Sequence, residues 1–134
     1  MTNEELREKF FAFLLKKPCT AKQAREFLEK HNAEDTEGLM LEAEGMKLVD
    51  DLAYAKLFAD GHLSWGNMKT AHELSMRGIS RSDIESALGE AEDECERAQE
   101  LAERWRASGL EERKITARLL SRGFTNKAVR SVIE

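Results

Sequence analysis

Apolar residues recur along most of this chain at the three- and four-residue spacing of amphipathic helices. In residues 3–17 they fall at Leu6, Phe10, Phe13 and Leu14, and Pro18 ends the run because proline lacks an amide donor. The same spacing predicts further helices that begin at Thr20 and Asp50 or cover residues 37–45, 67–77, 81–89, 92–107, 111–122 and 126–133. The pattern therefore indicates an all-α protein.

Polar residues at the predicted helix starts support this interpretation. Thr2 with Glu5, and Thr20 with Gln23, have the spacing of a capping box. Asp50 and Asp51 place carboxylates at the positive end of the next helix dipole. The residues predicted to face a core are Ala24, Phe27, Leu28, Leu39, Met40, Ala43, Met46, Leu48, Tyr54, Leu57, Phe58, Ala98, Leu101, Ala102 and Trp105.

One sequence pattern occurs twice, as "ELSMRGISRSDIESAL" in residues 73–88 and "RLLSRGFTNKAVRSVI" in residues 118–133. In each copy a glycine, Gly78 or Gly123, can end a helix in the left-handed conformation. The residue after it can fold back on a leucine of that helix, and a hydroxyl can cap the next helix. These contacts would pair Ile79 with Leu74 and Phe124 with Leu119, with Ser80 and Thr125 as caps.

The repeat predicts a tandem helical array. Gly123 follows Gly78 by 45 residues, a period in the range of helical repeats. Residues 24–31 resemble the same pattern loosely, with His31 near the glycine position. We therefore expect an elongated array of three helix-turn-helix-like, three-helix modules in one continuous repeat domain, with the modules at residues 2–49, 50–91 and 92–134.

Charge is spread unevenly over the 134 residues. The net charge is −5, yet the segment from Arg104 to Arg130 carries two acidic residues, Glu111 and Glu112, and eight basic ones. The basic residues are Arg104, Arg106, Arg113, Lys114, Arg118, Arg122, Lys127 and Arg130. This segment could contact an acidic partner or phosphates, or it could be an ordinary solvated helix face.

Sequence-specific DNA reading fits these charges poorly. The second helix of a DNA-binding helix-turn-helix must approach phosphates, but "RSDIESALGE" in the middle module carries more acidic than basic residues. In the last module, "NKAVRSVIE" is mildly basic and offers few side chains that pair with bases.

The sequence also lacks the patterns of an enzyme or a metal site. The three histidines have no nucleophile motif beside them, and the chain has no phosphate-binding glycine loop. Cys19 and Cys95 lie far apart and have no zinc-site spacing, so free thiols are expected. Asp50 and Asp51 could be imagined as a metal or acid–base pair, but capping explains them better. We predict no catalytic residue, metal or cofactor, and a cytoplasmic protein without a signal peptide or membrane span.

Two tryptophans stand at informative positions. Trp105 is in register with Leu101 and Ala102, which favours core packing. Trp65 lies with Gly66 in the predicted turn "SWGN", where it could either fill a module boundary or be exposed. Packing is the preferred interpretation for both.

Taken together, these motifs resemble the RecX family of regulators of the RecA recombinase. "VDDLAYA" in residues 49–55 is similar to the family's Leu-Asp-Asp-x-x-Phe-Ala signature. "SWGNMKTAHELSMRGIS" in residues 64–80 resembles its Gly-Tyr-Gly block, although Ser64, Lys69 and Thr70 depart from it. Residues 112–133 resemble the family's C-terminal block, and residues 14–28 resemble its first-module pattern.

The resemblance implies a non-enzymatic, cytoplasmic negative regulator. Family members bind RecA filaments on single-stranded DNA and suppress ATP hydrolysis, strand exchange and co-protease activity, and so modulate recombination, DNA repair and the SOS response. We expect a monomer that makes weak or indirect contact with single-stranded DNA. The expected contacts to RecA or phosphate are Lys69, Arg77, Arg104, Arg113, Lys114, Arg118, Arg122 and Arg130. Two alternatives stay open, a helical nucleic-acid-binding protein that acts without RecA and a scaffold for another partner.

Overall fold

The computed structural model describes residues 1–133, which form nine α-helices and no β-strand. No helix in this part of the chain combines the length and apolar character that a membrane span needs. The helices are α1 (Asn3–Lys16), α2 (Ala21–Lys30), α3 (Thr36–Gly45), α4 (Asp51–Gly61), α5 (Asn67–Met76), α6 (Arg81–Glu90), α7 (Glu94–Ala107), α8 (Glu112–Ser121) and α9 (Asn126–Ile133).

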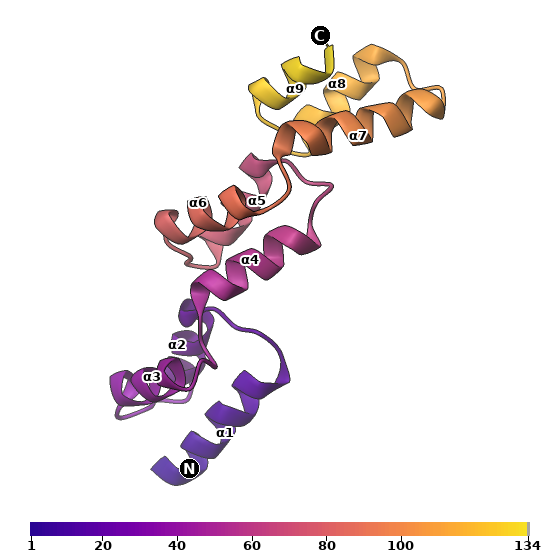
Figure 1. Cartoon of the computed structure of the whole chain (residues 1–134). Helices are drawn as coiled ribbons and strands as arrows, with labels where there is room; N and C mark the ends of the chain where they lie inside the picture. The colour runs from indigo at the N-terminus through magenta and orange to yellow at the C-terminus, as the bar shows by residue number, and fades with distance from the viewer. Residues whose placement is uncertain (134) are drawn as a thin grey trace.

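The helices form an elongated array of three modules, α1–α3, α4–α6 and α7–α9, which follow one another from the N-terminus to the C-terminus (Figure 1). Each module has its own cluster of buried side chains. These clusters centre on Phe10 and Leu28, on Leu74 and Ile79, and on Ile115 and Phe124. The predicted all-α array of three-helix modules is thus confirmed, while the boundaries at 2–49, 50–91 and 92–134 stay a prediction.

Side chains begin the helices as the sequence predicts. The Thr2 hydroxyl accepts a hydrogen bond from the Glu5 amide at 3.1 Å. Thr20 and Gln23 form a complete capping box at the start of α2. Asp50 accepts the Ala53 amide at 3.1 Å. Local sequence alone therefore accounts for several helix starts.

The prediction of a core position is wrong for two residues. Leu57 is 65% exposed and Met46 is 58% exposed. Ala55 and Ala59 are the residues of α4 that point inward, and Leu57 lies about 200° around the helix from Ala55. Met46 lies beyond the last turn of α3, as its C-cap residue. Both side chains therefore face solvent.

The glycine turn occurs in all three modules. Gly78 and Gly123 each have φ 83°, and the next residue donates its amide to a buried leucine of the helix just ended, Ile79 to Leu74 and Phe124 to Leu119, both at 3.1 Å. In the first module the residue at this position is Asn32, with φ 54°, which directly follows His31, the residue that the sequence places near the glycine position. Asparagine tolerates the left-handed conformation, and Ala33 then donates to the carbonyl oxygen of Leu28.

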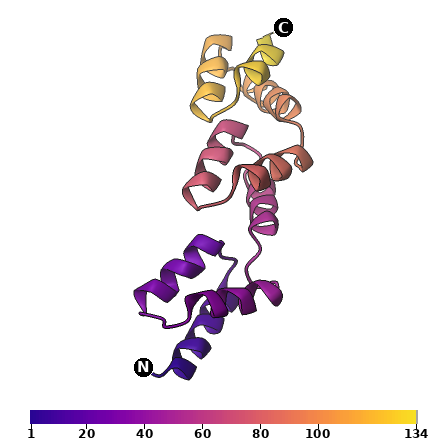
Figure 2. The ribbon, with the colours of Figure 1, turned by 90° about the vertical axis from the view of Figure 1, so that its left-hand side faces the viewer.

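The middle helices of the modules, α2, α5 and α8, lie end to end (Figure 2). At the junction of the last two modules, the Gly66 amide donates to the carbonyl oxygen of Arg122 at 2.8 Å, and Met68 donates to Gly123 at 3.0 Å. At the first junction, the Thr20 hydroxyl donates to the carbonyl oxygen of Arg77 at 2.9 Å. The N-termini of α2 and α5 thus satisfy carbonyl groups at the C-terminal ends of α5 and α8.

These junctions leave no room for side chains at two glycines. A Cβ atom on Gly66 would lie 2.0 Å from the Phe124 amide nitrogen, and one on Gly123 would lie 2.6 Å from the Lys69 amide nitrogen. By contrast, a Cβ on Gly109, which also has positive φ, would meet no atom within 4 Å. The repeated glycine therefore ends a helix and also lets the neighbouring module approach.

The pair Gly123→Ala and Gly109→Ala separates these two effects. Both changes force alanine into the left-handed conformation, which costs about 1–2 kcal/mol. Only Gly123→Ala also places a methyl group against backbone atoms, so we expect it to lower the free energy of unfolding by at least about 1 kcal/mol more than Gly109→Ala. Urea denaturation followed by circular dichroism measures the difference. Equal losses would contradict the close-approach role of Gly123.

Candidate interaction surface

Acidic residues fix the junctions between modules. Asp51, in the first turn of α4, accepts the Ala21 amide at the start of α2 at 2.8 Å. At the next junction Glu94, in the first turn of α7, accepts the Asn67 amide of α5 at 2.8 Å and the Thr125 hydroxyl at 2.6 Å. Asp50 and Asp51 therefore have separate structural tasks, the first capping its own helix and the second capping a helix of the neighbouring module.

Arg97 is a buried cation at the junction of the middle and last modules. It is 5% exposed, and its guanidinium donates to the carbonyl oxygens of Leu63 and Trp65 and to the Asn67 side chain. Burial lowers its pKa, and the carboxylates of Glu94, Glu92 and Asp93 oppose that shift. Arg97 thus holds the turn that contains Trp65 against α7.

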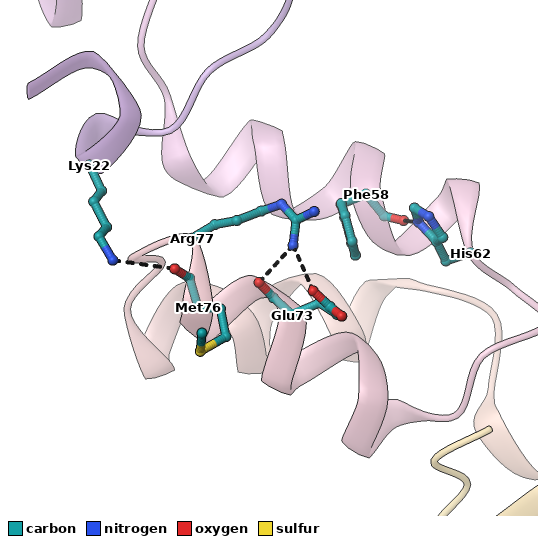
Figure 3. A network of polar contacts seen from close by, with 6 residues as sticks. All are labelled: Lys22, Phe58, His62, Glu73, Met76 and Arg77. Carbon is teal, nitrogen blue, oxygen red and sulfur yellow. Dashed lines mark hydrogen bonds and ion pairs between the residues drawn. The ribbon is translucent and has the colours of Figure 1, made fainter. Parts of the chain in front are cut away.

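In the middle module, basic side chains lie over aromatic rings (Figure 3). The Arg77 guanidinium lies 4.7 Å from the Phe58 ring centroid and donates to the Glu73 carboxylate at 3.0 Å. His62 stacks on Phe58 at 4.2 Å, and its Nδ1 donates to the Phe58 carbonyl oxygen at 2.7 Å. Because a carbonyl only accepts, this bond places a proton on Nδ1 of His62.

The same arrangement continues to the last module. Trp65 lies 4.1 Å from the His62 ring, and the Lys69 ammonium lies 4.3 Å from the Trp65 centroid. In α7, Trp105 carries two cations, Arg118 at 5.0 Å and Arg122 at 5.2 Å. We call these residues the cation–aromatic strip: Phe58, His62, Trp65, Lys69, Arg77, Trp105, Arg118 and Arg122.

The strip contains cations that are not neutralised within the described chain. Arg77 forms an ion pair with Glu73, but Lys69, Arg118 and Arg122 form none among residues 1–133. Burial tends to lower the pKa of Arg77, but Glu73 and Tyr54 outweigh that effect and its pKa is raised. The strip can therefore present positive charge to an acidic or phosphate-bearing surface.

The other predicted contact residues lie apart from the strip. Arg104 borders a hollow with Glu92 and Glu100, and Arg113 lies 3.9 Å from the Glu111 carboxylate. Lys114 and Arg130 are exposed, and no ring lies under them in the described residues. The structure thus brings together Lys69, Arg77, Arg118 and Arg122 of the eight predicted contacts.

The structure shows a different role for each tryptophan. Trp105 packs against the last core cluster and also contacts the guanidinium groups of Arg118 and Arg122. Trp65 is half-buried and contacts Phe58, His62 and Lys69. The sequence pattern predicts a core position for Phe58 and no site for His62. The four-residue spacing of Phe58 and His62 was the available signal, since such residues share a helix face.

The described residues show no metal-binding arrangement. Among residues 1–133, no group of three His, Cys, Asp or Glu side chains is placed to hold an ion. Cys19 is buried and Cys95 is half-buried, and both are free thiols.

The junction role of Asp51 can be tested with two substitutions. Asp51→Ala leaves the Ala21 amide without its acceptor, so we expect it to lower the free energy of unfolding by about 1–2 kcal/mol. Asp51→Asn keeps an oxygen acceptor, and we expect a loss of less than about 0.5 kcal/mol at neutral pH. Chemical denaturation of both variants measures this, and equal losses would contradict the junction role.

Asp51 also predicts a pH effect. Burial is the main cause that raises its pKa above the ordinary value of 3.8, so the folded state holds this proton more tightly than the unfolded state. The stability of the natural protein relative to Asp51→Asn should therefore be greatest below pH 3.8 and should fall as the pH rises just above it. Denaturation at a series of pH values measures the difference, and a rise over that window would contradict the assignment.

Comparisons with known proteins show similarity to RecX proteins. The sequence model described as RecX, second three-helix domain, matches residues 50–88. A protein of Pectobacterium atrosepticum named Regulatory protein RecX is 29% identical over 136 residues, which cover 96% of this chain and 84% of the relative.

Solved structures show the same fold. The crystal structure of RecX from Lactobacillus salivarius has a TM-score of 0.85 at 22% identity and covers 98% of this chain and 94% of its own. A second crystal structure, of regulatory protein RecX, has a TM-score of 0.79 at 22% identity and covers 98% and 72%. The middle module of this chain thus matches the second three-helix domain of RecX, the chain resembles a RecX relative along nearly its whole length, and it shares the helical array of two RecX crystal structures.

Proposed function

We propose that this protein is a negative regulator of RecA. It binds RecA filaments on single-stranded DNA, inhibits their ATPase, strand-exchange and co-protease activities, and so modulates recombination, DNA repair and the SOS response. The observation that carries the proposal is the cation–aromatic strip, which runs over two consecutive modules of an extended array. A filament offers a repeated surface, which an extended array can contact at several points.

The strip is suited to protein contact because its cations are already ordered. Lys69 contacts the Trp65 ring, and Arg118 and Arg122 contact the Trp105 ring. The Arg122 guanidinium also lies 3.5 Å from the Ser64 carbonyl oxygen. Ordered side chains lose less conformational freedom on binding, so more of each contact contributes to affinity. These three residues are the contacts that we expect to matter most for RecA.

A RecA-independent nucleic-acid binder is the second candidate. Its support is the alternation of rings and cations, which is typical of surfaces that bind single strands. Two observations weigh against it. Lys69 and His62 already contact the Trp65 ring, so a base would have to displace them to stack there. The net charge of −5 also opposes binding to a bare polyanion.

Charge reversal on the strip tests the proposal. In the triple variant Lys69→Glu, Arg118→Glu, Arg122→Glu, we expect the concentration that half-inhibits RecA ATPase on single-stranded DNA to rise at least about tenfold, because ordered cations become repulsive. The matched control is Lys30→Glu with Lys127→Glu, two exposed lysines outside the strip. Circular dichroism checks that both variants remain folded.

The outcomes are distinct. A folded triple variant that inhibits as well as the natural protein would show that the strip does not contact RecA. No inhibition by the natural protein at one molecule per RecA would remove the RecA function itself. Strong, salt-dependent binding of the natural protein to bare single-stranded DNA would favour the second candidate.

A further inference from the structure

A groove at the junction of the first and middle modules shares no residue with the cation–aromatic strip. Its volume is about 400 Å³, and it lies between the end of α1, the segments that follow α1 and α3, and one face of α4. A second hollow of about 330 Å³ adjoins it and shares Lys17, Pro18, Cys19 and Tyr54 with it. Together they have the size of a site for a few large side chains.

Exposed leucines line both sides of the groove. Leu15 of α1 is 70% exposed and Leu57 of α4 is 65% exposed. Beside them in the groove are Leu14 and Leu48, which belong to the first module's core cluster. Leaving two large leucines in water around one hollow forgoes the free energy that their burial would provide. A partner that covers them would recover it.

The rim of the groove is basic. Lys16, Lys17 and Lys47 line it, and none of the three forms an ion pair within residues 1–133. The acidic residue in the lining is Asp50, whose carboxylate already accepts the Ala53 amide. In a chain of net charge −5, this concentration of lysines is complementary to a segment that carries carboxylates.

The adjoining hollow contributes a negative charge, whereas the charged residues of the first groove are mostly positive. Glu26 and Gln23 line it beside the buried Cys19 and the half-buried Tyr54. A carboxylate of a partner would be repelled there and attracted to the three lysines of the first groove. Acidic side chains of an occupant therefore belong over the lysines, and its apolar side chains belong between Leu15 and Leu57.

We propose that this groove binds a short acidic amphipathic helix of a partner protein. The helix places leucine-like side chains between Leu15 and Leu57 and directs carboxylates to Lys16, Lys17 and Lys47. Helix-in-groove binding of this kind uses apolar anchors on one helix face and polar residues at the edge. Because the groove spans two modules, the bound helix also bridges α1 and α4. This inference does not depend on RecA and holds whether or not the strip binds a filament.

A designed peptide provides the probe. It is a fluorescein-labelled helix of about 14 residues with leucines on one face and glutamates elsewhere. The control peptides are one of the same composition whose leucines are scattered around the helix and one with lysines in place of the glutamates. Fluorescence anisotropy with the full chain measures binding, and the amide signals of Leu15, Lys47 and Leu57 in a ¹⁵N spectrum locate it.

We expect the acidic amphipathic peptide to bind at least about tenfold more tightly than either control and to shift those three signals. The variant Leu57→Glu with Lys47→Glu should weaken binding at least about tenfold, since it removes an anchor and reverses a rim charge. The matched control, Leu120→Glu with Lys127→Glu, changes an exposed leucine and an exposed lysine of the last module and should leave binding unchanged.

Four results would overturn the inference. They are no binding of the acidic peptide, equal binding of a control peptide, signal shifts confined to other modules, and unchanged binding by the folded groove variant. Sedimentation tests a further occupant. Self-association that Leu57→Glu abolishes would assign the groove to a second copy of this chain instead.

Discussion

The architecture depends on peptide groups that meet between modules. At the end of each middle helix, carbonyl groups lack partners within their own helix, and at the start of the preceding module's middle helix, polar hydrogens lack acceptors. Joining the two satisfies both, as the bond from Gly66 to Arg122 and the bond from Thr20 to Arg77 show. The opposite dipole ends of consecutive helices also face one another there, which is favourable. These joints set the distance between modules, and therefore the distance between surface residues of different modules.

The cation–aromatic strip follows from that spacing. Arg122 contributes its carbonyl oxygen to the joint and its guanidinium to Trp105, so the same residue connects the modules and presents charge. Arg97 holds the turn that contains Trp65, and Lys69 lies over that ring. The strip therefore has parts on two modules, and the joint brings the ends of α5 and α8 together between them.

The sequence predicted local features well and contacts between modules poorly. Helix starts, the turns at Gly78 and Gly123, and most core positions follow from residues close in sequence. The joints connect residues 27 to 58 positions apart, and no short-range pattern shows that Asp51 caps α2, that Arg97 is buried or that Gly66 meets Phe124. Within the candidate surface, the sequence shows which residues are basic. It does not show which of them lie over the same aromatic ring, because that depends on how the modules stack.

Joints made of backbone atoms impose few demands on side chains. They need a glycine where two chains approach closely, as at Gly66 and Gly123, and an acceptor such as Asp51 or Glu94, but they tolerate nearly any residue on the outer faces. The pitch of the array can thus stay constant while its surface chemistry changes during evolution. A lineage of such proteins can acquire new partners by surface substitution alone, without remaking its framework.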